Sequence, residues 1–391
     1  MVKLFNHLVE EVIKPGFCVG CGACVATCPV KCLDMKEEIP IMSRVCINCG
    51  ICHGMCPSVI NCRALQNDVF GSAPADDLLG TYVQALSVEA TDAAVKARCQ
   101  DGGAVTALLS SLLEAGYIDG AVVAGTAEEP WRPVARVATT TKELIECAGR
   151  KYSIAPITGG LRDAVNLYCC ENVAIAGTPC NILASWRMKF SEPTNRHIGD
   201  AIKLRIGLFC GGIFSYNKLK TEIAEKLLHI PLKDVVKFDI KDDKFLVYPR
   251  NKPKQELALS AVTQHMNLSC KLCPDFTSEL ADISVGAAGS PAGRSTVLIR
   301  TPTGSEAFDT AVKFGKFNAV ELEKVSPGIE GVRQEAKAKK SMAMETLETL
   351  RRLKQPLPVW LQERPTEVPK ETIESLKEIH AAATSSIESL K

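Results

Sequence analysis

The sequence predicts a chain of three parts, in which a small cysteine-rich module precedes an α/β domain and a helical extension. Two matched cysteine runs lie in the first 66 residues, strand and helix patterns alternate from Thr81 on, and charged, Ala-, Glu- and Lys-rich sequence follows about Val325. We expect a cysteine module at 1–66, a linker at 67–80, an α/β domain at 81–325 and a helical extension at 326–391. The predicted fold class is therefore α+β or α/β.

The N-terminal module carries one cysteine spacing twice. The first run is Cys18, Cys21, Cys24 and Cys28, and the second is Cys46, Cys49, Cys52 and Cys56, each followed by proline. This spacing is typical of bacterial-type ferredoxin domains with two [4Fe–4S] clusters, where the fourth cysteine of each run binds the other cluster. One cluster would then use Cys18, Cys21, Cys24 and Cys56, and the other Cys28, Cys46, Cys49 and Cys52. A zinc site would need only one group of four, without the duplication. We also expect a short helix after each run.

Composition excludes several classes of protein. The chain has 391 residues, is 46% hydrophobic and carries a net charge of +1, which gives no electrostatic footprint for nucleic acid. Its 18 cysteines occur in metal-like groups in a long chain, which favours a reducing interior over a disulfide scaffold. Neither a signal peptide nor an apolar run of about 18 residues is evident. We expect a cytoplasmic protein, and peripheral docking on a membrane complex stays open.

The middle of the chain alternates between strands and helices, which predicts an at least partly parallel sheet. Strands are expected at Thr81–Glu89, Ala121–Ala124, Val173–Ala176 and Arg205–Phe209, with a β-hairpin at Val235–Tyr248. Helices are expected at Gly103–Ala115, Lys142–Ala148 and Ser215–Leu228.

The C-terminal extension is predicted to hold two helices, Val332–Leu353 and Lys370–Leu390. Either both pack on the parent domain, or they form a docking arm for a partner subunit.

Four further cysteines have special positions. Cys180 and Cys210 follow expected strands, where open α/β sheets place ligands, and Cys270 and Cys273 form a C-x-x-C pair. Spacing alone leaves a third [4Fe–4S] cluster, a thiol–disulfide pair and a zinc half-site open. The other six lack ligand spacing and are expected to be small buried hydrophobes; they are Cys32, Cys62, Cys99, Cys147, Cys169 and Cys170.

Two glycine-rich segments could hold a phosphate or a flavin. The first is Gln100, Asp101, Gly102, Gly103 and Ala104, which opens a helix whose N-terminus attracts anions. The second contains Gly286, Gly289, Ser290, Gly293 and Ser295. Neither is a G-x-G-x-x-G or Walker A motif, so tight turns without a ligand are the alternative. A flavin would link a two-electron donor to one-electron clusters.

These segments together resemble the family of coenzyme F420 hydrogenase/dehydrogenase β subunits. The matching stretches are Cys99–Thr106, Gly149–Ser153, Gly177–Cys180, Gly207–Cys210, Cys270–Phe276, Ala281–Ile283, Gly286–Ser295 and Arg300-Thr301, in order over about residues 76–325. With the ferredoxin module in front, the chain is most similar to the input subunits of F420H2 dehydrogenases and F420H2 oxidase modules. The resemblance implies an archaeal oxidoreductase of methanogenesis-related metabolism.

The resemblance also implies cofactors and residue roles. It implies FAD in the α/β domain, a third [4Fe–4S] cluster on Cys180, Cys210, Cys270 and Cys273, and coenzyme F420 as the substrate. The implied FAD contacts are Gln100, Asp101, Gly102, Gly103, Ala104, Lys151, Tyr152, Ser153, Gly177, Thr178, Pro179, Gly286, Gly289, Ser290, Gly293 and Ser295, with Lys151 as the catalytic candidate. Arg150, Arg187, Lys189, Lys203 and Arg205 are candidates for binding the anionic tail of F420.

In the implied reaction, hydride passes between F420 and FAD, and single electrons pass through the clusters to a partner complex. The partner would be a membrane-bound dehydrogenase, a heterodisulfide reductase or a reductase module. A ferredoxin-dependent flavin reductase acting on another organic substrate, and an electron-transfer subunit without a substrate site, remain as alternatives.

Overall fold

The computed structural model describes residues 2–190, 193–241 and 243–361. Its centre is an eight-stranded sheet in the order β13-β3-β12-β11-β7-β6-β4-β5. The strands are β3 (Gln84–Ala90), β4 (Gly120–Thr126), β5 (Pro133–Ala138), β6 (Val173–Gly177), β7 (Ile202–Leu208), β11 (Ile283–Gly286), β12 (Ser295–Ile299) and β13 (Phe317–Glu321). The neighbours β11, β7, β6 and β4 run parallel, and the remaining pairs are antiparallel. The predicted partly parallel sheet is thus confirmed.

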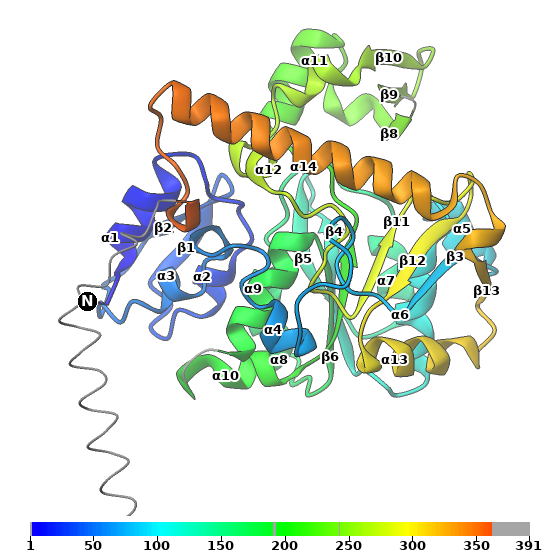
Figure 1. The fold of residues 1–391 in the computed structure, drawn as a ribbon, viewed down its shortest axis with the longest axis horizontal. Helices are drawn as coiled ribbons and strands as arrows, with labels where there is room; N and C mark the ends of the chain where they lie inside the picture. Colours follow the sequence, from blue (N-terminus) through cyan, green and yellow to red (C-terminus); the bar gives the residue numbers. More distant parts are fainter. Residues whose placement is uncertain (1, 191–192, 242, 362–391) are drawn as a thin grey trace, which may run out of the picture.

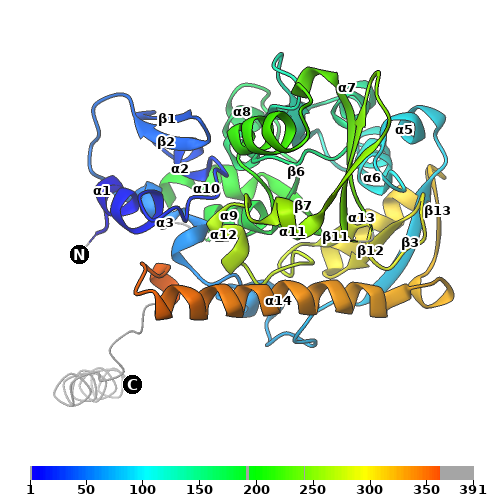
Figure 2. The ribbon, with the colours of Figure 1, turned by 90° about the horizontal axis from the view of Figure 1, so that it is seen from above.

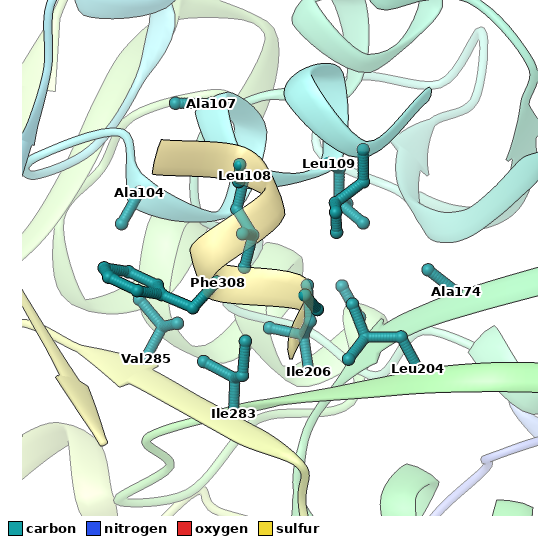
Figure 3. Close-up of a cluster of buried hydrophobic side chains, with 14 of the residues drawn as sticks. Ala104, Ala107, Leu108, Leu109, Ala174, Leu204, Ile206, Ile283, Val285 and Phe308 are labelled. Atoms are coloured by element: carbon teal, nitrogen blue, oxygen red, sulfur yellow. The ribbon is translucent and has the colours of Figure 1, made fainter. Parts of the chain in front are cut away.

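Helices cover both faces of the sheet, so its central strands are buried on two sides, as parallel strands usually are. One face carries α5 (Ala93–Arg98), α6 (Ala104–Glu114), α7 (Thr141–Cys147) and α13 (Pro302–Val312), and the other carries α8 (Gly160–Asn166), α9 (Pro179–Lys189) and α10 (Pro193–Asp200). In the first layer, Leu108 and Leu109 of α6 pack with Ile206, Ile283 and Phe308 (Figure 3). The helix predicted at Gly103–Ala115 is thus confirmed, and its leucines face the core.

A smaller lobe stands beside the main sheet (Figure 1). It contains a three-stranded sheet of β8 (Val235–Lys241), β9 (Lys244–Pro249) and β10 (Gln255–Ala258), and α11 (Leu259–Thr263). The predicted hairpin is confirmed, whereas β10 was not predicted because its four residues carry no strand pattern. The helix expected at Ser215–Leu228 forms as a π-helix over Lys218–Leu227.

The N-terminal module contains α1 (Phe5–Leu8), the π-helix Val9–Ile13, α2 (Ala23–Ala26), the hairpin strands β1 (Leu33–Lys36) and β2 (Ile39–Met42), and α3 (Ile51–Gly54). A helix was expected after each cysteine run, but α2 and α3 lie inside the runs, and only the second run is followed directly by a short 3-10 helix, Pro57–Val59. Gly22 and Gly50 have φ angles of 84° and 78°, and each begins its helix directly after the second cysteine. The module packs on α8 and α9 through Cys21, Ala23 and Met55.

One long helix connects all of these parts. This helix, α14 (Gly328–Arg352), runs along the side of the molecule from the sheet toward the N-terminal module (Figures 1 and 2). Two shorter helices complete the fold, α4 (Gln66–Phe70) and α12 (Leu268–Leu272). Val332 and Ala336 pack with the buried Leu79, and Leu347 joins the hydrophobic cluster of the module. The second predicted helix, Lys370–Leu390, lies outside the described residues. Among the helices described, none has the length and apolar character needed to cross a membrane.

Candidate functional site

Four thiols from the two N-terminal cysteine runs line one pocket. They belong to Cys18, Cys21, Cys24 and Cys56, which we call the first cysteine set. Burial, together with the nearby thiol of Cys56, raises the pKa of Cys21 to about 11. Cys56 therefore lies with the first run, although it belongs to the second run in sequence.

A second pocket is lined by Cys28, Cys46, Cys49 and Cys52, the second cysteine set, and also by Cys32, whose Sγ lies 3.4 Å from that of Cys28. Burial raises the pKa of Cys52 to about 11, and the thiols of Cys49, Cys46 and Cys28 contribute to the increase. Cys49 is exposed, and Val45 and Ile47, which flank Cys46, are 88% and 58% exposed. The second set therefore lies at the protein surface.

The last four predicted ligands also meet, and we call them the third cysteine set. Cys180 begins the helix after β6, Cys210 follows β7, and Cys270 and Cys273 lie in and after α12. Burial, together with the thiols of Cys270 and Cys273, raises the pKa of Cys210 to about 12. Burial also raises the pKa of Cys180, to which the thiols of Cys21, Cys270 and Cys210 add.

The three sets follow one another through the molecule. Cys180 of the third set interacts electrostatically with Cys21 of the first, and Cys24 of the first interacts in the same way with Cys52 of the second. The described residues contain no group of three or more His, Cys, Asp or Glu that could hold a metal ion as they stand. The first set therefore lies between the third set and the second, and the second contains the exposed Cys49.

The third set has a cationic neighbour that sequence reasoning missed. Lys339 of α14 is 4% exposed, and its Nζ donates hydrogen bonds to the carbonyl oxygens of Gly211 (2.8 Å) and Cys270 (2.5 Å). Its positive charge lowers the pKa values of Cys210, Cys270 and Cys273 against the raising effect of burial. In sequence, Lys339 is one lysine in a charged helix, which ordinarily indicates a solvated face.

Several of the expected flavin contacts lie at one edge of the sheet. Gly177 ends β6 and Gly286 ends β11, and both strands run parallel to the β7 strand between them. Thr178 and Pro179 follow β6 and begin α9. Open α/β sheets bind ligands at the carboxyl ends of their parallel strands. This edge, which also carries Cys210, is therefore a candidate cofactor site.

The segment around Ser153 lies beside the chain that follows Cys210. The N–H of Ile154 donates to the carbonyl of Phe214 (3.0 Å), and the N–H of Phe214 donates to the carbonyl of Tyr152 (3.1 Å). Ser153 is buried, and its hydroxyl has no hydrogen-bond partner among the described residues. Because an unpaired buried hydroxyl is costly, Ser153 is a candidate contact for a bound group.

The glycine-rich segments serve more than one purpose. A Cβ at Gly102 would lie 2.4 Å from the Val88 carbonyl oxygen and 2.5 Å from the Ser295 nitrogen, so this glycine is required by packing against the protein's own backbone. Gly103 has a φ of 72° and precedes α6, which begins without a side-chain cap. Gly289 packs against α14, whereas a Cβ at Gly293 would meet nothing within 4 Å. Ser290 and Thr296 share a hydrogen bond of 2.8 Å.

The first glycine-rich segment also contacts the small lobe. The side chain of Gln100 donates to the carbonyl of Phe238 on β8 (3.2 Å), and Arg150 forms an ion pair with Asp101 (3.0 Å). Burial raises the pKa of Asp101, and Arg150 opposes that increase. The junction between sheet and lobe therefore brings charged groups next to the N-terminus of α6.

Lys151 is held by the end of a helix. Its Nζ donates to the carbonyls of Cys147 (2.5 Å), Ala148 (3.2 Å) and Gly149 (3.0 Å), which uses all three donors of the ammonium group. Burial lowers the pKa of Lys151 to about 8.

The other basic candidates lie in different places. Arg187 donates to the carbonyl of Gly54 in the N-terminal module, and Lys203 lies over the ring of Tyr117 (4.1 Å). Arg205 is buried over the ring of Trp186 (3.7 Å). Burial raises the pKa of Asp282, and the charge of Lys189 is among the groups that oppose this increase. Of the five, Arg150 lies beside the first glycine-rich segment.

Two of the motif residues hold the fold together. Arg300 donates to Ser284 Oγ (2.6 Å) and to the carbonyls of Leu79 and Thr81 (both 2.8 Å). Asp282 accepts from the N–H of Arg205 (2.8 Å) and from the Thr301 hydroxyl (2.7 Å). Sequence patterns alone do not separate these structural residues from cofactor contacts.

The fold and the three sets define an α/β protein with cysteine-lined cavities in an attached module and a further cysteine set at the carboxyl edge of its sheet. The chain belongs to the family of coenzyme F420 hydrogenase/dehydrogenase β subunits: residues 85–162 match the family's N-terminal part and 170–325 its C-terminal part. Residues 1–84 and α14 lie outside these matches.

Similar proteins come from methanogenic archaea. The coenzyme F420 hydrogenase subunit beta of Methanosarcina barkeri is 36% identical over 273 residues, which is 70% of this chain and 94% of that protein. An F420H2 dehydrogenase subunit of Methanosarcina mazei is 28% identical over 77% of this chain and 84% of its own length. A chain in the structure of the F420-reducing [NiFe] hydrogenase complex from Methanosarcina barkeri has a TM-score of 0.68 and 34% identity, covering 71% of this chain and 95% of its own.

The family supports an F420-linked oxidoreductase subunit. The coenzyme F420-dependent sulfite reductase of Methanocaldococcus jannaschii is also similar, at 34% identity over 82% of this chain and 50% of that protein. The similar proteins therefore differ in the reaction to which F420 is coupled.

Proposed function

We propose that this chain is an F420H2 dehydrogenase subunit that transfers hydride between coenzyme F420 and FAD and single electrons through three [4Fe–4S] clusters to a partner complex. The observation that carries the proposal is the order of the cysteine sets. The third set adjoins the edge of the sheet expected to bind FAD, the first set follows it, and the second set reaches the surface.

The donor chemistry of each set fits an iron–sulfur cluster. Every set contributes four thiols, the soft ligand that such clusters require, and each of the first two surrounds its own cavity. The crossed membership of Cys28 and Cys56 agrees with the ligand exchange of two-cluster ferredoxins. Binding iron would release the thiol protons, which the burial of these groups otherwise retains.

The residues at the carboxyl edge also fit a flavin. We infer that the hydroxyl of Ser153, the uncapped start of α6 and the open Gly293 would contact FAD. Bound there, FAD would supply the conversion between two-electron and one-electron chemistry. Lys151 would act through its charge, because the carbonyls at the end of α7 already occupy its donors.

Substrate binding is proposed at the junction between the sheet and the lobe. Arg150 is 35% exposed in its side chain and is paired with Asp101, so it can exchange this partner for an anionic group of F420. Such an exchange is electrostatic, and the affinity for F420 should therefore fall as salt rises.

The test combines composition with activity. Anaerobically prepared protein should contain about twelve irons, from three clusters of four, and one FAD per chain. With a viologen as the acceptor it should oxidise F420H2 and leave NADH and NADPH unchanged. An iron content of about eight would remove the third cluster from the proposal. Rapid NADH oxidation without F420H2 turnover would favour the alternative, a ferredoxin-dependent reductase of another substrate.

A further inference from the structure

We propose that Lys339 of α14 is a positioning residue that sets the reduction potential of the cluster on the third cysteine set. This inference rests on the proposed function, since it requires that cluster. It assigns a redox role to a helix that follows the part of the chain matched by the family.

Lys339 bridges two segments that carry the cysteines of the third set. Gly211, whose carbonyl accepts one hydrogen bond, directly follows Cys210, and the second carbonyl belongs to Cys270 itself. One side chain thus ties the loop after β7 to α12. Because these segments are about 60 residues apart in sequence, from 210 to 270, the bridge fixes the relative positions of cysteines that local structure leaves independent.

The bridging group is also a buried charge. Lys339 is 4% exposed, and no acidic side chain is hydrogen-bonded to its Nζ among the contacts of the described residues. A buried ammonium with carbonyl partners alone keeps its positive charge uncompensated at short range, and it interacts with three of the four thiols of the set.

A nearby positive charge favours the more negative of two redox states. Reduction adds an electron to a cluster, so the ammonium stabilises the reduced form and raises the midpoint potential. Of the three sets, this one lies nearest to the proposed flavin site. The charge of Lys339 would therefore favour electron transfer from the flavin site into the cluster on the third cysteine set.

The test is a redox titration of the full chain in which electron paramagnetic resonance monitors each cluster. In Lys339→Met, which keeps the length and removes the charge, the equilibrium constant for reducing one cluster should fall about tenfold. That fall corresponds to about 59 mV for a one-electron couple. The other two clusters should keep their potentials. Lys339→Arg, which keeps the charge, should stay near wild type.

The control is Lys337→Met, which removes the same charge from an exposed position of the same helix. If Lys339→Met loses the cluster, Lys339→Gln, which keeps a hydrogen-bond donor without the charge, is titrated instead. A potential unchanged in the neutral variant, or shifted equally by Lys337→Met, would overturn the inference. Loss of the cluster from both neutral variants would also overturn it, because Lys339 would then be needed for assembly. A wild-type iron content of about eight would instead refute the third cluster in the proposed function.

Discussion

Glu38 should make the joint between the N-terminal module and the small lobe sensitive to pH. It lies at the turn between β1 and β2, and its carboxylate accepts a hydrogen bond of 2.8 Å from the N–H of Tyr216. Burial raises the pKa of Glu38 from 4.5 to about 7, although the Tyr216 N–H and Arg132 act in the opposite direction. The native state therefore binds more protons than the unfolded state between these two pH values, and stability falls as pH rises through this window.

The magnitude follows from the two pKa values. Their difference, 7 minus 4.5, is about 2.5 pH units, and at about 1.36 kcal/mol each this corresponds to at most about 3 kcal/mol. Glu38→Gln removes the ionisation. Relative to wild type, the free energy of unfolding of the variant should therefore rise by up to about 3 kcal/mol between pH 4.5 and pH 8.

Anaerobic urea unfolding, followed by tryptophan fluorescence at several pH values, measures this difference. Glu37→Gln is the matched control, because Glu37 is the preceding residue in the same turn and is exposed. A difference between wild type and Glu38→Gln that stays flat with pH would refute the reasoning. An equal pH dependence in the control would refute it as well.

Three further predictions concern the redox chain. Cys56→Ser and Cys18→Ser should each remove the same paramagnetic signal and about four irons, because both cysteines belong to the first set; loss of different signals would contradict the crossed ligation. Lys151→Met should slow F420H2 oxidation about tenfold with normal flavin content, and an unchanged rate in stopped-flow would assign Lys151 to capping α7 alone. Val45→Asp should slow electron transfer to the native partner but not to a viologen, whereas the similarly exposed control Val83→Asp should affect neither; equal effects of the two substitutions on the native partner would argue against docking at the second set.

Most elements of the α/β domain could be located from sequence because its strands and helices carry regular apolar patterns. The apolar stripe on α6 is a local feature that arises because one face of this helix is buried. The continuous apolar run Val173–Gly177 arises because both faces of β6 are buried. The strand order could not be predicted, since β3 lies between β12 and β13, more than 200 residues away in sequence. Such pairings depend on the packing of the whole domain.

The cysteines and the other site residues differ in how far sequence reveals them. Cys180 and Cys210 could be expected to meet, because parallel strands end at a common edge. The contact of Lys339 with the third set could not be expected from sequence, because its partners are carbonyl oxygens 69 or more residues away. The glycine-rich segment around Gly102 likewise suggested that another group approaches its backbone closely. The sequence could not reveal that this group is the backbone of β3 and β12.

In the proposed function, hydride enters from F420H2 and leaves the flavin site as single electrons on three clusters. The most direct test of this function mixes the oxidised chain with excess F420H2 in an anaerobic stopped-flow instrument without an acceptor. One FAD and three clusters hold about five electrons, so about two F420H2 should be consumed per chain as flavin and cluster absorbance bleach. If protein that contains its flavin and clusters consumed no F420H2, hydride transfer from F420H2 to this chain would be refuted.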